Sequence, residues 1–110
     1  MITAALLLNV AVLVPVCFGL LTSAGWASAA YGPATPARGI LLSVYLAILV
    51  GSLALLVVDR PEMAVALLAV QVVYKLTTPF TVGSVRNPVV VSNLLIAAFH
   101  GTAIASVWPV

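Results

Sequence analysis

Charged side chains are scarce in this sequence. Of its 110 residues, four are Lys or Arg and two are Asp or Glu, which is 5% of the chain. A soluble domain carries roughly a quarter charged residues, because a small domain leaves a large fraction of its surface in water. Six charges cannot cover such a surface, and 65% of the residues are hydrophobic. The composition excludes a small soluble domain and indicates that lipid is the solvent for most of the chain.

Cysteine and histidine are almost absent as well. The single Cys17 cannot form a disulfide within the chain. The single His100 has no Cys or His partner at metal-ligand spacing, and a haem held by two histidines would need its second from elsewhere. We therefore expect no metal and no cofactor. The net charge of +2 comes from dispersed residues, so nucleic acid is not an expected partner.

Long apolar segments are what the sequence does contain. About 20 apolar residues cross a bilayer as a helix, and four segments of that length are separated by short connections. These features predict an all-α integral membrane protein, a bundle of four transmembrane helices in one membrane domain, residues 1–110, in contact with the lipid bilayer. The predicted helices are Ile2–Leu21, Pro36–Val58, Pro61–Phe80 and Pro88–Trp108.

Three of these segments begin with a capping residue and a proline. The pairs are Thr35 with Pro36, Asp59 with Pro61, and Asn87 with Pro88. Such residues accept bonds from the first N–H groups of a helix, and proline suits the first turn. Glu62 follows Asp59 by three residues, which resembles a capping box. A carboxylate pair for acid–base chemistry is the alternative interpretation of these two acids.

The first apolar segment has a second interpretation. Ala27-Ser28-Ala29 follows it and resembles the cleavage site of a signal peptide. No basic residue precedes the segment, and the segment is long for a signal peptide, so we expect a retained helix. Cleavage of residues 1–29 stays the alternative. Trp26, Tyr31 and Trp108 are suited to the membrane interface.

The basic residues predict an orientation. Arg38, Lys75 and Arg86 belong to the first and third connections, whereas Arg60 alone, beside two acids, belongs to the second. The positive-inside rule places the first and third connections in the cytoplasm, with both termini outside. The composition, rich in Ala and Val, is typical of a bacterial inner (plasma) membrane protein.

Polar residues recur on one side of each of the last two segments. Spacings of three and four residues place them on a common face. Counting 1.5 Å per residue from the shared turn predicts two contacts, Lys75 with Asn93 and Gln71 with His100. The candidate polar intramembrane site comprises Gln71, Tyr74, Lys75, Thr78, Asn93 and His100.

Each ionisable residue of this site has a structural explanation too. Lys75 could extend its ammonium to the nearby interface, and His100 could be a neutral hydrogen-bonding residue between helices. The functional interpretation is that ionisable residues within a membrane mark a pathway or a site. The cluster could bind a quinone carbonyl or an anionic headgroup, or relay a proton.

Small residues form two stripes at spacings of three and four. Such stripes let helices approach closely, and two exceed what one small bundle needs. We therefore expect a homo-oligomer or association with larger membrane subunits. The packing seams are Ala47, Gly51 and Ala54 on the second segment and Ala97, Gly101 and Ala105 on the fourth.

The size and helix number are similar to those of the small multidrug resistance transporters. That family depends on a glutamate embedded in its first helix. Here the first segment has no acid, Asn9 is its most polar interior residue, and Glu62 lies at a helix start. The resemblance therefore ends at the architecture.

Three functions remain. The first is an accessory subunit or self-associating scaffold of a membrane assembly, with the polar residues as packing contacts. The second is a small transporter or channel whose pathway is the polar stripe. The third is a quinone- or lipid-binding membrane enzyme that uses His100 as acid–base and Lys75 as anion clamp. No catalytic motif identifies a reaction.

Overall fold

The computed structural model describes residues 1–109, which form five α-helices. Four of these helices are long and apolar enough to cross a membrane, which confirms the all-helical expectation. The fifth is a short helix between the first two long ones. The helices are α1 (Ile2–Thr22), α2 (Gly25–Tyr31), α3 (Pro36–Val57), α4 (Pro61–Val82) and α5 (Pro88–Val107).

The three predicted helix starts at Pro36, Pro61 and Pro88 are confirmed, and so are two of the three predicted side-chain caps. The Thr35 hydroxyl accepts a hydrogen bond from the Arg38 N–H at 3.3 Å, and Asn87 Oδ1 accepts one from the Val89 N–H at 2.8 Å. The predicted cap at Asp59 is wrong. Residue Arg60 precedes the first helical residue, and no side chain caps α4. The reason is that Pro61 takes the first helical position, where its missing N–H and fixed φ are favourable, and this moves the cap one residue past Asp59.

Helix α4 is longer than predicted. It continues through Pro79 to Val82 and ends at Gly83, whose φ of +77° lies in the left-handed region. Glycine adopts that conformation without strain, and its N–H closes the helix by donating to the Pro79 carbonyl. The glycine therefore ends the helix, rather than the proline.

Helix α2 was not predicted, because its residues were assigned to a loop. It is held by tertiary contacts rather than by its own apolar pattern. The Arg38 guanidinium, although it begins α3, donates to Ser28 Oγ at 3.1 Å and the Gly32 carbonyl at 2.9 Å, and to Ser23 Oγ at 2.8 Å. Hydrogen bonds from a charged donor are about twice as strong as neutral ones, so Arg38 fixes α2 across the end of α1.

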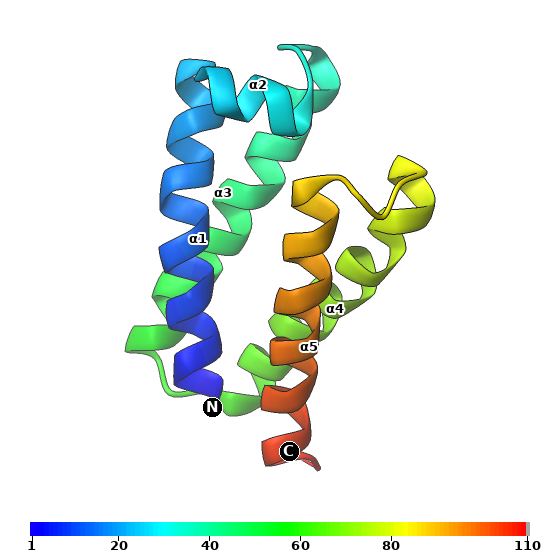
Figure 1. Cartoon of the computed structure of the whole chain (residues 1–110). Helices are drawn as coiled ribbons and strands as arrows, with labels where there is room; N and C mark the ends of the chain where they lie inside the picture. The colour runs from blue at the N-terminus through cyan, green and yellow to red at the C-terminus, as the bar shows by residue number, and fades with distance from the viewer. Residues whose placement is uncertain (110) are drawn as a thin grey trace.

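The long helices are arranged as two pairs (Figure 1). Helix α1 packs along α3 and α4 packs along α5, while the two pairs touch each other much less. Both chain ends lie at one end of the bundle, called here the terminal end. Helix α2 and the α4–α5 connection lie toward the opposite end, called here the α2 end.

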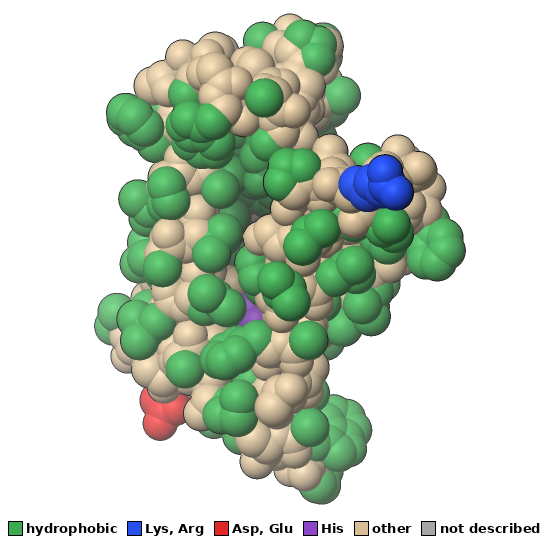
Figure 2. Space-filling model, in the orientation of Figure 1, with side chains coloured by type: hydrophobic (Ala, Val, Ile, Leu, Met, Phe, Trp, Pro, Cys, Tyr) green, Lys and Arg blue, Asp and Glu red, His purple; other side chains and the backbone are tan. Residues whose placement is uncertain are grey.

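The exterior is apolar, and the interior holds polar side chains among its apolar ones. Val57 is 86% exposed and Phe80 is 85% exposed, and hydrophobic side chains cover much of the face in Figure 2, with the few charged groups toward the two ends. This is the reverse of a soluble protein, in which charged residues are almost never fully buried. The buried polar residues are Asn9, Arg38, Ser52, Gln71, Lys75, Asn93 and His100.

Candidate functional site

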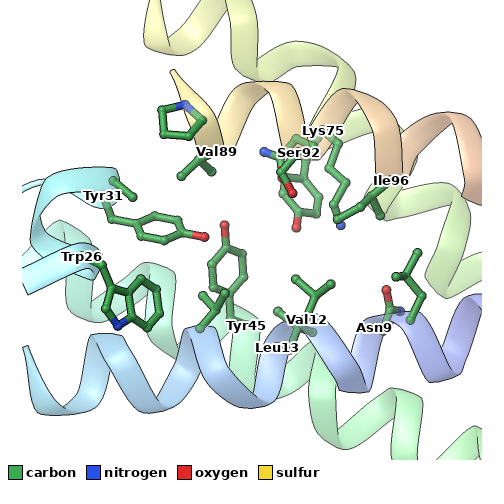
Figure 3. Close-up of a pocket in the computed structure, with 16 residues that line it drawn as sticks. Asn9, Val12, Leu13, Trp26, Tyr31, Tyr45, Lys75, Val89, Ser92 and Ile96 are labelled. Carbon is green, nitrogen blue, oxygen red and sulfur yellow. The ribbon is translucent and has the colours of Figure 1, made fainter. Parts of the chain in front are cut away.

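A cavity of about 180 Å³ lies between the two helix pairs, and we call it the Lys75 cavity. Every helix contributes to its wall (Figure 3). Its apolar wall comes mainly from α1 and α5, including Val12, Val16, Val89 and Ile96. Its polar lining is Asn9, Tyr31, Tyr45, Tyr74, Lys75, Ser92 and Asn93.

Lys75 is the only charged side chain that lines the Lys75 cavity. It is 5% exposed. Its ammonium donates a hydrogen bond to Gln71 Oε1 at 3.1 Å and lies 4.9 Å from the centre of the Tyr74 ring. An ammonium has three N–H donors, and Gln71 accepts one of them. The remaining donors are available to a molecule in the cavity.

The direction of the Lys75 side chain answers one question left by the sequence. Gln71 lies one turn before Lys75 on α4, which is further from the α2 end. The ammonium is therefore drawn toward the middle of the bundle. The sequence allowed the Lys75 ammonium to extend toward the nearby end of α4, but in the structure it does not.

Lys75 has no acidic side chain nearby. Asp59 and Glu62 are the only acidic side chains in the sequence, and both lie before or at the start of α4. Glu62 precedes Lys75 by 13 residues on the same helix, or about 20 Å at 1.5 Å per residue. Among residues 1–109, the only hydrogen-bond acceptor of the buried Lys75 ammonium is thus a neutral amide.

Tyrosine hydroxyls supply further polar groups to the Lys75 cavity. Tyr31 of α2 and Tyr45 of α3 stack edge to face, with ring centres 6.0 Å apart and planes at 77°, and their hydroxyls point into the cavity (Figure 3). Burial raises the pKa of Tyr31, which lies outside the four long helices, so its hydroxyl stays protonated. A second cavity, of about 500 Å³, adjoins the first and shares Tyr31, Tyr45, Tyr74 and Asn93.

Among residues 1–109, no hydrogen bond joins Lys75 to Asn93, the first of the two predicted contacts. Both residues line the Lys75 cavity, but Asn93 Nδ2 donates to Thr78 Oγ1 at 3.4 Å. The Thr78 hydroxyl in turn donates to the Lys75 carbonyl at 2.7 Å. The structure therefore brings Gln71, Tyr74, Lys75, Thr78 and Asn93 together along the α4–α5 boundary.

The predicted contact between Gln71 and His100 is not formed as a hydrogen bond. Gln71 Nε2 instead donates to the Leu67 carbonyl of its own helix at 3.4 Å. The His100 ring is fully buried, and within residues 1–109 neither of its nitrogens has a hydrogen-bond partner. His100 is also absent from the walls of the Lys75 cavity and its neighbour. His100 and Lys75, which the sequence placed in one site, therefore do not line one cavity.

A fully buried layer crosses the bundle beneath the Lys75 cavity. On α3, α4 and α5 its residues lie between those lining the Lys75 cavity and those lining a third cavity, of about 230 Å³, at the terminal end, whereas Ala5 of α1 lies beside Leu6, which lines the terminal cavity. On α4, for example, Ala64 lines the terminal cavity and Tyr74 the Lys75 cavity. The layer closes the bundle between them. Its residues, all with no exposed surface, are Ala5, Ser52, Leu68, Gln71, His100 and Ala103.

Sequence reasoning missed part of the site. Asn9 donates to Ser52 Oγ at 3.1 Å and joins α1 to α3, which leaves its carbonyl oxygen toward the Lys75 cavity (Figure 3). Tyr31 was assigned to the membrane interface, and Tyr45 was given no role. The available signal was that Asn9, Tyr45 and Ser52 interrupt otherwise apolar segments, where a polar group needs an internal partner.

The two seams of small residues differ in what they contact. At Gly51 an added Cβ would lie 3.5 Å from the Leu67 side chain, so this part of the α3 seam faces α4. At Gly101 an added Cβ would meet no atom within 4 Å. The remaining seam residues divide into exposed Ala47, Ala54 and Ala105 and buried Ala97.

Comparisons with protein-family models, curated proteins and solved structures gave no match. Function must therefore be argued from the site itself. Within residues 1–109 no three His, Cys, Asp or Glu side chains lie close enough to hold a metal ion. The site is instead rich in neutral hydrogen-bonding groups around one cation.

Proposed function

We propose that the protein is an integral membrane protein in which α1, α3, α4 and α5 span the bilayer. The support is the combination of apolar exterior and buried polar residues, since lipid offers polar groups no partners. Arg38 and Arg86 lie at the α2 end, which favours a cytoplasmic α2 end and external termini. The membrane is proposed to be a bacterial inner membrane, and retention of residues 1–29 stays a prediction.

Its proposed task is to bind an amphiphilic molecule taken from the bilayer. The observation that carries this proposal is Lys75, 5% exposed, beside a cavity with polar and apolar walls. Binding sites of this kind combine a mostly apolar wall with a few placed polar groups. The surface is hollowed between α1 and the end of α5 nearest α2 (Figure 2). This hollow lies on the side of the bundle, where a lipid-soluble molecule would enter.

Native mass spectrometry of the full chain, released gently from its own membrane, tests this proposal. We expect a bound small mass that survives purification and is lost in Lys75→Met. Arg86→Met is the matched control, because Arg86 is an exposed cation in the α4–α5 connection. A chain that carries no small molecule, or carries it equally in Lys75→Met, would contradict the proposal.

An accessory subunit or self-associating scaffold is the second candidate function. It is favoured by Gly101, where a side chain would meet open space, beside the exposed Ala105. Small residues left uncovered in one chain suit close approach of another helix. Gly101→Leu should then break the assembly. Thr102→Leu should leave it intact, because Thr102 is exposed and lies about 100° around α5 from Gly101. Native masses that are monomeric for the unchanged protein would exclude self-association, and larger partners would identify an accessory role.

The other two hypotheses have less support. A pathway through the bundle would have to cross the buried layer, which is closed at Leu68, Gln71 and His100. An enzyme with His100 as acid–base and Lys75 as anion clamp would need both at one cavity, and His100 does not line it. Liposome flux that disappears in Lys75→Met would restore the transport hypothesis.

A further inference from the structure

We infer that the amphiphile bound in the Lys75 cavity is a long-chain carboxylic acid, with its carboxylate at the Lys75 ammonium. This inference rests on the proposed binding function and adds the chemical class of the ligand. Its basis is a charge relationship. Lys75 is buried, and the two acidic side chains of the sequence, Asp59 and Glu62, lie before or at the far end of its helix. Because a buried charge is costly unless paired, an anion completes the site.

The hydrogen-bonding groups around Lys75 also fit an anionic oxygen. The ammonium has donors beyond the one given to Gln71, and the Tyr31 and Tyr45 hydroxyls point into the same cavity. A carboxylate accepts through two oxygens and donates nothing, so it can take bonds from several of these groups at once. A quinone carbonyl or an alcohol would accept from them but leave the lysine charge unbalanced.

The size and walls of the cavity favour a small headgroup with a hydrocarbon tail. A volume of about 180 Å³ has room for a carboxylate and its first methylenes. Apolar residues of α1 and α5, namely Leu8, Val12, Val16, Val89 and Ile96, line the cavity. Burying each methylene along such a wall is favourable, so the tail would follow these two helices out toward lipid.

Displacement of a fluorescent polyene fatty acid tests the inference. The full chain, in a neutral detergent, is loaded with the fluorescent acid and titrated with oleate or with oleyl alcohol, which differ only in the headgroup. We expect the concentration of oleate that displaces the probe to be about tenfold lower than that of oleyl alcohol, or lower still. The reason is that hydrogen bonds to charged groups are stronger than those between neutral groups. In Lys75→Met the preference for the acid should disappear, whereas Lys75→Arg and Arg86→Met should keep it.

The outcomes separate the inference from the proposed function. Equal displacement by oleate and oleyl alcohol would overturn the carboxylate while leaving an amphiphile site in place. Failure of the chain to bind the probe, together with no small molecule bound after native extraction, would overturn both. If Lys75→Met does not fold, as judged by circular dichroism and gel filtration, the comparison of acid and alcohol on the unchanged protein decides the matter by itself.

Discussion

The Lys75 ammonium lies 3.1 Å from Gln71 Oε1, and this hydrogen bond joins two buried residues on consecutive turns of α4. The bond draws the lysine away from the nearer helix end. It also occupies the amide oxygen of Gln71, the residue that the sequence predicted to contact His100. One local contact within a helix therefore decides where the Lys75 ammonium lies.

The first prediction concerns this pair. Gln71→Leu removes the acceptor of a buried ammonium and should lower the free energy of unfolding by about 1.5–3 kcal/mol. The double variant Gln71→Leu with Lys75→Met should recover most of this loss, because it has no buried ammonium that needs an acceptor. Thermal unfolding in detergent of both single variants and the double variant gives the coupling energy. Losses that simply add would show that the two side chains act independently.

The second prediction concerns His100. Because neither ring nitrogen has a partner within the described residues, replacing the imidazole with an apolar side chain of similar size should be neutral or stabilising. We expect His100→Leu to keep the melting temperature, whereas His100→Ala should lose about 2–3 kcal/mol through the space it leaves. Both variants are compared by thermal unfolding in the same detergent. A marked loss in His100→Leu would mean that the imidazole makes a bond in the membrane and would revive its role between helices.

The third prediction uses Cys17 as a natural reporter of α2. Cys17 is buried in one cluster with Ala27 of α2, and Arg38 fastens that helix through Ser23, Ser28 and Gly32. Arg38→Met should let α2 open and raise the rate of Cys17 labelling by N-ethylmaleimide about tenfold or more, because opening populations follow local stability. Arg60→Met, at the opposite end of the bundle, is the control. Unchanged labelling in Arg38→Met would show that apolar packing holds α2.

The fourth prediction concerns the bond between Asn9 and Ser52, which joins α1 to α3. Hydrogen bonds between membrane helices contribute about 0.6 kcal/mol on average, and about 1.7 kcal/mol at most. We expect Asn9→Leu and Ser52→Ala to show a coupling within that range in a double-mutant cycle by thermal unfolding. The control pairs Asn9→Leu with Ser43→Ala, because Ser43 is an exposed serine on α3, the helix that carries Ser52. This second pair should show no coupling.

The sequence predicted helix caps and helix faces correctly where the interacting residues are close together in the chain. Thr35 and Asn87 cap helices as predicted, because an acceptor side chain and a following proline act within one turn. The polar stripe of α4 followed from spacing alone, and five of the six predicted site residues lie together. The sixth, His100, could not be placed, because the sequence does not reveal that Gln71 satisfies its amide within its own helix.

Contacts between distant segments could not be read in the same way. Helix α2 depends on Arg38, which is ten residues from Ser28, and no periodic apolar pattern marks those seven residues. The cap expected at Asp59 failed because Pro61 competes for the first helical position. In both cases an interaction that the local sequence pattern does not show decided the structure.

The sequence by itself determined the apolar character of this protein and the number of its long helices, because four segments are long and apolar and only six residues carry a charge. Only the tertiary structure decided what the interior can bind. The pairing of α1 with α3 and of α4 with α5 opens a cavity between them. Helix packing also places Tyr31 and Tyr45 in the same cavity as Lys75, although both are far from it in the chain and no spacing along one helix relates them.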